Sequence, residues 1–90
     1  MATVKFTSAL GRFFPGLSEM QVSGGTIKEV ITKVASEVPG IDGYLLEEDG
    51  SLRKHVNIFI KEDLIQDRQA LSDPVRQSDE VLIYQALSGG

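Results

Sequence analysis

Cysteine is absent from the chain, and histidine occurs once, as His55. Without cysteine, the chain can form no disulfide and offers no thiolate to a metal or a substrate. No serine lies in a G-x-S-x-G context, so this sequence signal of a serine nucleophile is missing as well. We interpret His55, which follows Arg53 and Lys54, as a polar residue at the edge of a strand. These absences argue against an enzyme, a bound metal and a bound cofactor.

Basic runs and long apolar runs are also missing. The net charge is −4, with 13 acidic and 9 basic residues, which suits simple solubility or a basic protein partner. The lack of a basic run argues against a nucleic-acid partner. The apolar runs are far shorter than a membrane span, and residues 1–5 do not resemble a signal peptide. We therefore expect no membrane partner and a location in the cytoplasm.

The first half of the chain predicts two strands and one long helix. Residues 3–7 and 18–22 alternate polar and apolar side chains, as half-buried strands do, and a loop between them suits an antiparallel pair. Thr26 and Glu29 form a capping box at a helix start, and Pro39-Gly40 ends the helix. The apolar stripe of this helix consists of Ile27, Val30, Ile31, Val34, Ala35 and Val38.

The second half is richer in strand signals. Residues 56–60 and 81–86 predict strands, and residues 64–65 predict a brief return strand. Tyr44-Leu45-Leu46 suits either a short strand or a turn, and Asp49-Gly50 centres an exposed turn. A single helix with one apolar stripe needs one sheet to cover it. The sequence therefore predicts a two-layer α+β domain, with one main helix packed on a mixed sheet of four to five strands.

Within the long polar segment 66–78, Leu71 and Val75 are the expected anchors to the core. We also expect Phe13-Phe14 to close one end of the core.

Two short segments suggest ion sites, but each has a simpler explanation. Glu47-Glu48-Asp49 could contact a cation, yet a solvated turn explains it better because calcium-ligand spacing is absent. Gly24-Gly25-Thr26 precedes a helix start, where anions can bind. It lacks the lysine and the glycine spacing of a phosphate loop, which favours a turn followed by a helix cap.

The end of the sequence, Leu87-Ser88-Gly89-Gly90, is the remaining candidate. Chain ends outside a sheet are normally mobile, and glycine increases that mobility. We therefore divide the chain into a domain at 1–86 and a flexible tail at 87–90. The tail is either an unused end, including glycines left by cloning, or a carboxylate that a narrow enzyme channel can admit. Adenylation by ATP would turn that carboxylate into an electrophile that sulfur or an amine can attack.

The sequence resembles the ubiquitin-like sulfur carriers across nearly its whole length. The resemblance lies in the run Val56-Asn57-Ile58-Phe59-Ile60, in Asp79-Glu80-Val81-Leu82-Ile83 and in the final Gly89-Gly90. This group includes the small subunit of molybdopterin synthase and the carriers of the thiamine and cysteine pathways, and residues 50–58 look most like the cysteine carrier.

The resemblance implies a β-grasp fold and a defined set of partners. It implies that an enzyme similar to ubiquitin-activating enzymes adenylates Gly90 with ATP and converts it to a thiocarboxylate, with Gly89 as its flexible neighbour. A downstream synthase would then accept the sulfur. The chain would be a carrier and not an enzyme, with ATP used by the partner. A protein modifier joined to lysines through Gly90, and a small subunit of molybdopterin synthase, remain as alternatives.

The strand pattern also predicts a docking surface. If Val81 and Ile83 face the helix, Leu82 and Tyr84 face outward, as Phe59 does on its own strand. With Leu87 and Ser88 just beyond, these residues would give partners an apolar patch beside the reactive end. The alternative is a strand register that places some of them under the loop at residues 66–78.

Overall fold

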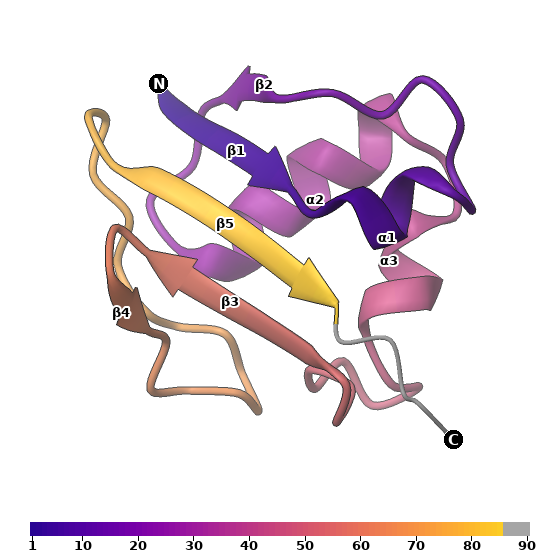
Figure 1. Cartoon of the computed structure of the whole chain (residues 1–90). Coiled ribbons are helices and arrows are strands. Elements are labelled where there is room, and N and C mark those ends of the chain that lie inside the picture. The colour runs from indigo at the N-terminus through magenta and orange to yellow at the C-terminus, as the bar shows by residue number, and fades with distance from the viewer. Residues whose placement is uncertain (86–90) are drawn as a thin grey trace.

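Five strands form one mixed sheet within residues 1–85, the part of the chain that the computed structural model describes, apart from the side chains of residues 8 and 9 (Figure 1). The order across the sheet is β2-β1-β5-β3-β4. The central pair, β1 and β5, is parallel, and the other three pairs are antiparallel. The strands are β1 (Ala2–Phe6), β2 (Met20–Val22), β3 (Val56–Ile60), β4 (Asp63–Leu64) and β5 (Glu80–Gln85).

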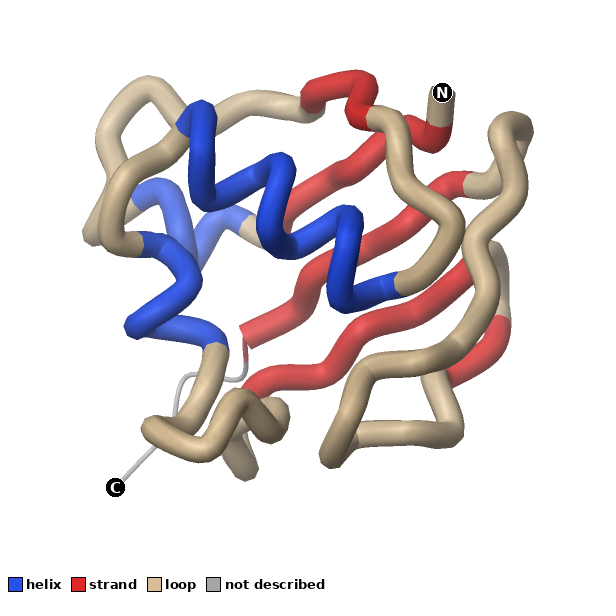
Figure 2. The backbone as a smooth tube through the Cα atoms, turned by 180° about the vertical axis from the view of Figure 1, so that it is seen from behind, coloured by secondary structure: helices blue, strands red, loops and turns tan. Residues whose placement is uncertain are grey.

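The helices pack on one face of this sheet, as Figure 2 shows from behind. The long helix is α2 (Ile27–Glu37), and two short helices are α1 (Ser8–Gly11) and α3 (Ile41–Leu45). The predicted two-layer arrangement, with one main helix on a mixed sheet, is confirmed. The predicted boundary at residue 86 lies outside the described residues.

Helix α2 forms where its stripe and its capping box predict. Ile27, Val30, Ile31 and Val34 are buried against the sheet. Thr26 Oγ1 accepts a hydrogen bond from the Glu29 N–H at 3.2 Å, and Glu29 Oε1 accepts one from the Gly25 N–H at 3.0 Å. This reciprocal capping satisfies polar groups that a helix start otherwise leaves open.

The core lies between α2 and the inward side chains of the central strands. Val4 on β1, Ile58 on β3 and both Val81 and Ile83 on β5 are fully buried. Leu71 and Val75 are buried too, so the predicted anchors of the long loop are confirmed. Their loop reaches the start of α2, where the carbonyl of Leu71 accepts from the Lys28 N–H at 2.9 Å. The loop is therefore part of the helix layer.

Two short helices occupy segments for which the sequence predicted none. Residues 8–11 were expected in a connection but form α1, and Tyr44-Leu45, expected in a strand or turn, lies in α3. Gly40 explains the second difference, because its φ of 93° reverses the chain after α2 and lets a new helix begin. Neither helix is long enough for a full apolar stripe to reveal it in the sequence.

The prediction for Phe13-Phe14 is wrong for its first residue. Phe13 is 53% exposed, whereas Phe14 packs partly against the core. The ring centroids of Phe13 and Phe14 lie 4.9 Å and 5.7 Å from that of Tyr44. The two phenylalanines thus form an aromatic cluster with Tyr44 of α3, and only Phe14 helps to close the core.

The first strand pair and the turn at Asp49-Gly50 were also predicted from the sequence. The first strand of the predicted pair agrees closely, but β2 begins at Met20 and not at residue 18. The exposed turn at Asp49-Gly50 is confirmed, with Gly50 at φ 90°. Among the described residues, no helix combines the length and the apolar character needed to cross a membrane.

Candidate functional site

The face of the sheet opposite the helices carries the predicted docking residues. Val81 and Ile83 point into the core, so Leu82 and Tyr84 between and beyond them point to the open face. Strand register places Phe59 directly opposite Leu82. The predicted outward orientation of these three residues is confirmed, and their role in binding a partner stays a prediction.

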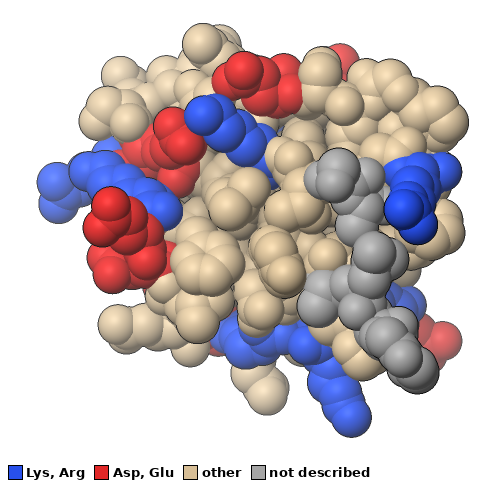
Figure 3. All heavy atoms as spheres, in the orientation of Figure 1, with Lys and Arg blue, Asp and Glu red and all other residues tan. Residues whose placement is uncertain are grey.

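A row of side chains crosses the open face through this pair. On one side of Leu82 lies its register partner Lys5 on β1, and on the other side of Phe59 lies Leu64 on β4. Tyr84 is 42% and Leu64 is 52% exposed, while Phe59 and Leu82 are half-buried. Figure 3 shows uncharged surface over the middle of this face, with charged groups around it. The open face is therefore an apolar patch with a charged rim, which is typical of a protein contact.

The start of β5 is fixed by Asp79, a buried carboxylate. Its Oδ2 accepts from the Arg76 N–H at 2.8 Å, and its Oδ1 lies 3.4 Å from Lys61 Nζ. The hydrogen bond from Arg76, followed by the charge and hydrogen bond of Lys61, holds the pKa of Asp79 below its ordinary value of 3.8. The carbonyl of Asp79 also accepts from the Thr3 N–H at 3.1 Å. The strand that leads to the tail is thus anchored at the residue just before its first one.

The far end of β5 is the point from which the tail continues. Gln85 pairs with Val56, and its N–H donates to Thr7 Oγ1 at 3.4 Å. The tail residues that the sequence singled out, Gly89 and Gly90 with Leu87 and Ser88, lie outside the described residues. The fold therefore positions Gln85, the end of β5, which precedes these residues in the sequence.

Arg68 holds the strand next to that end, and nothing in the sequence pointed to it. Its half-buried guanidinium donates to Asn57 Oδ1 at 3.0 Å and to the carbonyls of Arg53 and Val56, each at 2.8 Å. The planar fork of arginine suits such a set of acceptors. It ties the long loop to the start of β3, which pairs with the end of β5. No local pattern reveals this role, because the acceptors are distant in sequence.

The structure supports neither suggested ion site. No group of three or more histidine, aspartate or glutamate residues that could hold a metal was found among the described residues. In the acidic turn, Glu47 pairs with Arg53 at 3.0 Å, and Asp49 accepts from the N–H and hydroxyl of Ser51. His55 is exposed beside β3, as expected.

The backbone donors at the start of α2 already have partners. The N–H groups of Ile27 and Lys28 donate to the carbonyls of Asp73 and Leu71, at 3.0 Å and 2.9 Å. The Glu29 N–H is taken by Thr26, as described above. An anion would find no open donor among these three groups, so the turn-and-cap interpretation of Gly24-Gly25-Thr26 is confirmed.

Known proteins resemble this chain along its whole length. The model of the ThiS family matches residues 12–90. The sulfur carrier protein CysO of Mycobacterium tuberculosis is 27% identical over 98% of this chain and 97% of that protein.

Solved structures agree in fold. A chain in the crystal structure of the Amycolatopsis orientalis BexX/CysO complex superposes with a TM-score of 0.86, at 26% identity and over 100% of both chains. The small archaeal modifier protein 1 of Methanosarcina acetivorans gives a TM-score of 0.79, at 25% identity over 99% of this chain and 95% of that one. The predicted β-grasp fold is thereby confirmed.

Proposed function

Because the chain belongs to the ThiS family, we propose that it is a sulfur carrier that works through the carboxylate of Gly90. The observation that carries this proposal is the similarity to a sulfur carrier protein over 98% of the chain. The absence of cysteine supports it, since the chain has no side-chain thiol that could hold sulfur instead. The proposal treats Gly90 as the last residue of the working protein.

The chemistry starts with activation of the carboxylate by a partner enzyme. One carboxylate oxygen of Gly90 attacks the α-phosphate of ATP, which releases pyrophosphate and leaves an acyl adenylate. Hydrosulfide, or an equivalent sulfur nucleophile, then attacks the carbonyl carbon and displaces AMP, which leaves the thiocarboxylate. The chain contributes no catalytic group and acts as a co-substrate, while the enzyme binds the ATP. Gly89 has no Cβ and lets the backbone thread a narrow channel to that centre.

The folded domain serves the activating enzyme as a handle. Leu82 and Tyr84 on β5, with Phe59 beside them on β3, give it an apolar patch on the open face. Leu87 and Ser88, which lie outside the described residues, are further contacts that we propose for the enzyme. A downstream synthase that accepts the sulfur would use the same handle, because the thiocarboxylate is presented from the same strand. A recipient in cysteine synthesis, rather than in the thiamine or molybdopterin pathway, stays a prediction, as does the cytoplasmic location.

A second candidate function is conjugation to lysines through Gly90. The similarity to a small archaeal modifier protein favours it. The activation step is the same in both cases, and only the nucleophile that attacks the acyl adenylate differs.

Capture from the native host under denaturing conditions distinguishes these functions. A carrier gives one free band, and its intact mass includes a species in which one oxygen is replaced by sulfur. A modifier gives a ladder of covalent products. The matched control is a chain that lacks Gly90, which should give neither. A working chain that continues past Gly90, or a sulfur species that persists without Gly90, would contradict the proposal.

A further inference from the structure

The edge of the sheet at β2 presents unpaired backbone groups. On β1, the Thr3 N–H donates to Asp79 and the Thr7 N–H donates to Ile83, so the odd-numbered residues face β5. The even-numbered Ala2 and Val4 therefore face β2, where their register partners are Val22 and Met20. Gln21, between these two partners, turns its N–H and C=O away from the sheet. Such groups are a template for a further strand.

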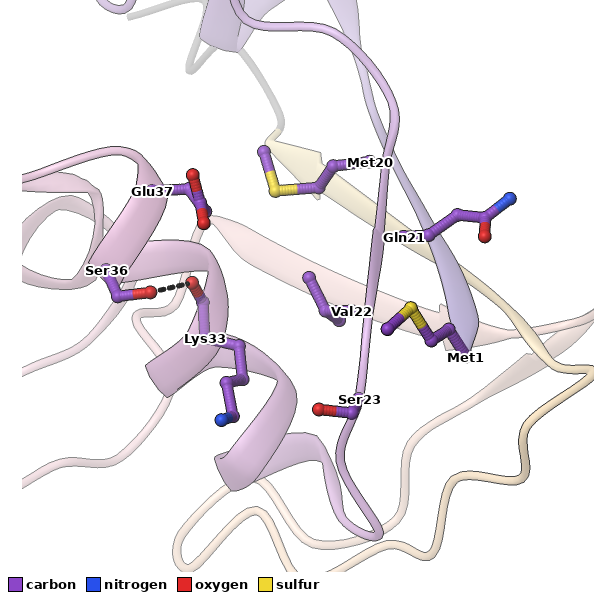
Figure 4. A pocket seen from close by; sticks show the side chains of 8 residues that line it. All are labelled: Met1, Met20, Gln21, Val22, Ser23, Lys33, Ser36 and Glu37. Carbon is purple, nitrogen blue, oxygen red and sulfur yellow. Dashed lines mark hydrogen bonds between the residues drawn. The ribbon is translucent and has the colours of Figure 1, made fainter.

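A hollow of about 410 Å³ lies beside this edge, between β2 and α2. Figure 4 shows that Met20 and Val22 point from β2 toward the helix, whereas Gln21 points the other way. Lys33 and Glu37 line the opposite wall, on exposed positions of α2. A strand added at this edge would thus direct every second side chain into the hollow.

The charges in the hollow are separated along its length. Lys33 extends toward the end at Ser23, and Glu37 lies at the end near Met20 (Figure 4). Neither Lys33 nor Glu37 belongs to an ion pair within residues 1–85. Four residues of helix rise about 6 Å, and two residues of strand rise about 6.6 Å. Two charged side chains on one face of an added strand have the right spacing to meet both groups.

We propose that the β2 edge binds an extended segment of a partner protein with the pattern acidic-x-basic as an antiparallel strand. The middle residue exchanges both backbone hydrogen bonds with Gln21, as an antiparallel hydrogen-bonded pair does. Because the strand runs from the Val22 end toward the Met20 end, its acidic side chain comes first and meets Lys33. Its basic side chain follows and meets Glu37.

Long charged side chains fit this hollow in a second way. Their apolar stems lie against Met20 and Val22, while their charged ends reach the helix. Antiparallel pairing is favoured over parallel pairing, which is less stable per residue. This surface lies at the β2 edge and does not involve the open face, so the inference is independent of the proposed sulfur-carrier function.

The test is an NMR titration of the labelled full chain with two five-residue peptides. One is acetyl-Thr-Glu-Val-Lys-Thr-amide, and the other has Glu and Lys exchanged. We expect saturable shifts at Gln21, Val22, Lys33 and Glu37, and binding of the first peptide about fivefold tighter than the second. The factor corresponds to two exposed ion pairs of about 0.5 kcal/mol each.

Two variants make the test specific. Gln21→Pro removes the outward N–H, which an edge strand tolerates, and should abolish the shifts, whereas Gln21→Thr should keep them. The double variant Lys33→Glu with Glu37→Lys changes only exposed groups and should reverse the preference between the peptides.

Three results would overturn the proposal. The first is a set of saturable shifts at residues away from β2 and α2. The second is a double variant that keeps the same preference between the two peptides. The third is a set of shifts at Gln21 that change with protein concentration when no peptide is present. The last result would assign the edge to a second copy of the chain.

Discussion

Gly24 is held where its backbone comes close to α2. A Cβ at this position would lie 3.2 Å from both the Cβ of Glu29 and the backbone nitrogen of Val30. A backbone atom inside a capped helix cannot move aside cheaply. The close approach of the chain to the helix start therefore favours glycine here, in addition to the turn that the sequence predicted.

We predict that Gly24→Ala lowers the free energy of unfolding by about 1–3 kcal/mol, the usual range for overpacking. The matched control is Gly11→Ala, because a Cβ at Gly11 would meet nothing within 4 Å. The control should change stability by less than about 0.5 kcal/mol. Urea unfolding of both variants measures the difference. Equal stability of the two variants would show that the chain relaxes freely around Gly24.

The sequence could not reveal the roles of residues whose contacts are made with distant parts of the chain. The outward side of Leu82 and Tyr84 follows from the strand period, because alternation alone decides which face a side chain takes. The clamp made by Arg68 depends on Asn57 and on two carbonyls that are brought to it only by folding. The same holds for the charges of the hollow, which lie on α2 and meet β2 only in the folded chain.

At the scale of elements, the loop at residues 66–75 is braced by two carboxylates. Asp67 accepts from the hydroxyl of Ser72 and from the N–H groups of Gln69 and Ala70. These hydrogen bonds, that of Ser72 first, lower the pKa of Asp67 from 3.8 to about 2. Asp73 accepts from the N–H groups of Gln66 and Asp67. Since this loop also caps α2, its order supports the helix.

The lowered pKa of Asp67 predicts how stability depends on pH. Its folded pKa lies below its unfolded value, so its contribution is present above about pH 4 and is lost as the pH falls through about 2. We predict that Asp67→Asn is less stable at pH 7 and loses less stability than the parent between pH 4 and pH 2.

Asp63→Asn is the matched control, because Asp63 makes no side-chain hydrogen bond or ion pair within the described residues. It should follow the parent through this range. Urea unfolding at several pH values gives the comparison. A parent and an Asp67→Asn variant with parallel profiles would contradict the role of this carboxylate.

The open face of the sheet predicts which variants weaken adenylation by the activating enzyme. Tyr84→Ser removes an exposed apolar group from the open face and should lower kcat/KM for adenylation about tenfold, as loss of a contact residue worth about 1.4 kcal/mol does. Phe13→Ser is the control, because Phe13 is similarly exposed but packs on Tyr44 in the helix layer. ATP–pyrophosphate exchange with the activating enzyme measures both. Similar losses in the two variants would argue against a specific docking patch.

Helices and strands with a strong period of apolar residues could be predicted from the sequence, whereas the two short helices could not. The stripe and capping box of α2, and the alternation in β1, β3 and β5, place these elements to within a few residues. Helices α1 and α3 have four and five residues, too few for a period to stand out. The start of α3 depends on Gly40, and both helices contribute side chains to the core.

For the molecule as a whole, we propose that the domain serves the activating enzyme as a handle and that its central strand, β5, precedes the reactive end in the sequence. β5 lies between β1 and β3 at the centre of the sheet, and its start is fixed by Asp79. A central strand is the most firmly held part of a small sheet, since it is paired on both sides. Gln85, the last residue of this strand, therefore has a fixed place relative to the open face. This is what an enzyme needs in order to recognise the domain and act on the terminus.

The proposed sulfur-carrier function is tested most sharply by locating the sulfur after charging in vitro. The full chain is incubated with ATP, its activating enzyme and a sulfide source, and its intact mass and C-terminal fragments are measured. We predict that one oxygen is replaced by sulfur, that the sulfur lies on Gly90, and that a chain without Gly90 gains none. Sulfur on any other residue, or no gain with any enzyme that adenylates ThiS-family proteins, would contradict it.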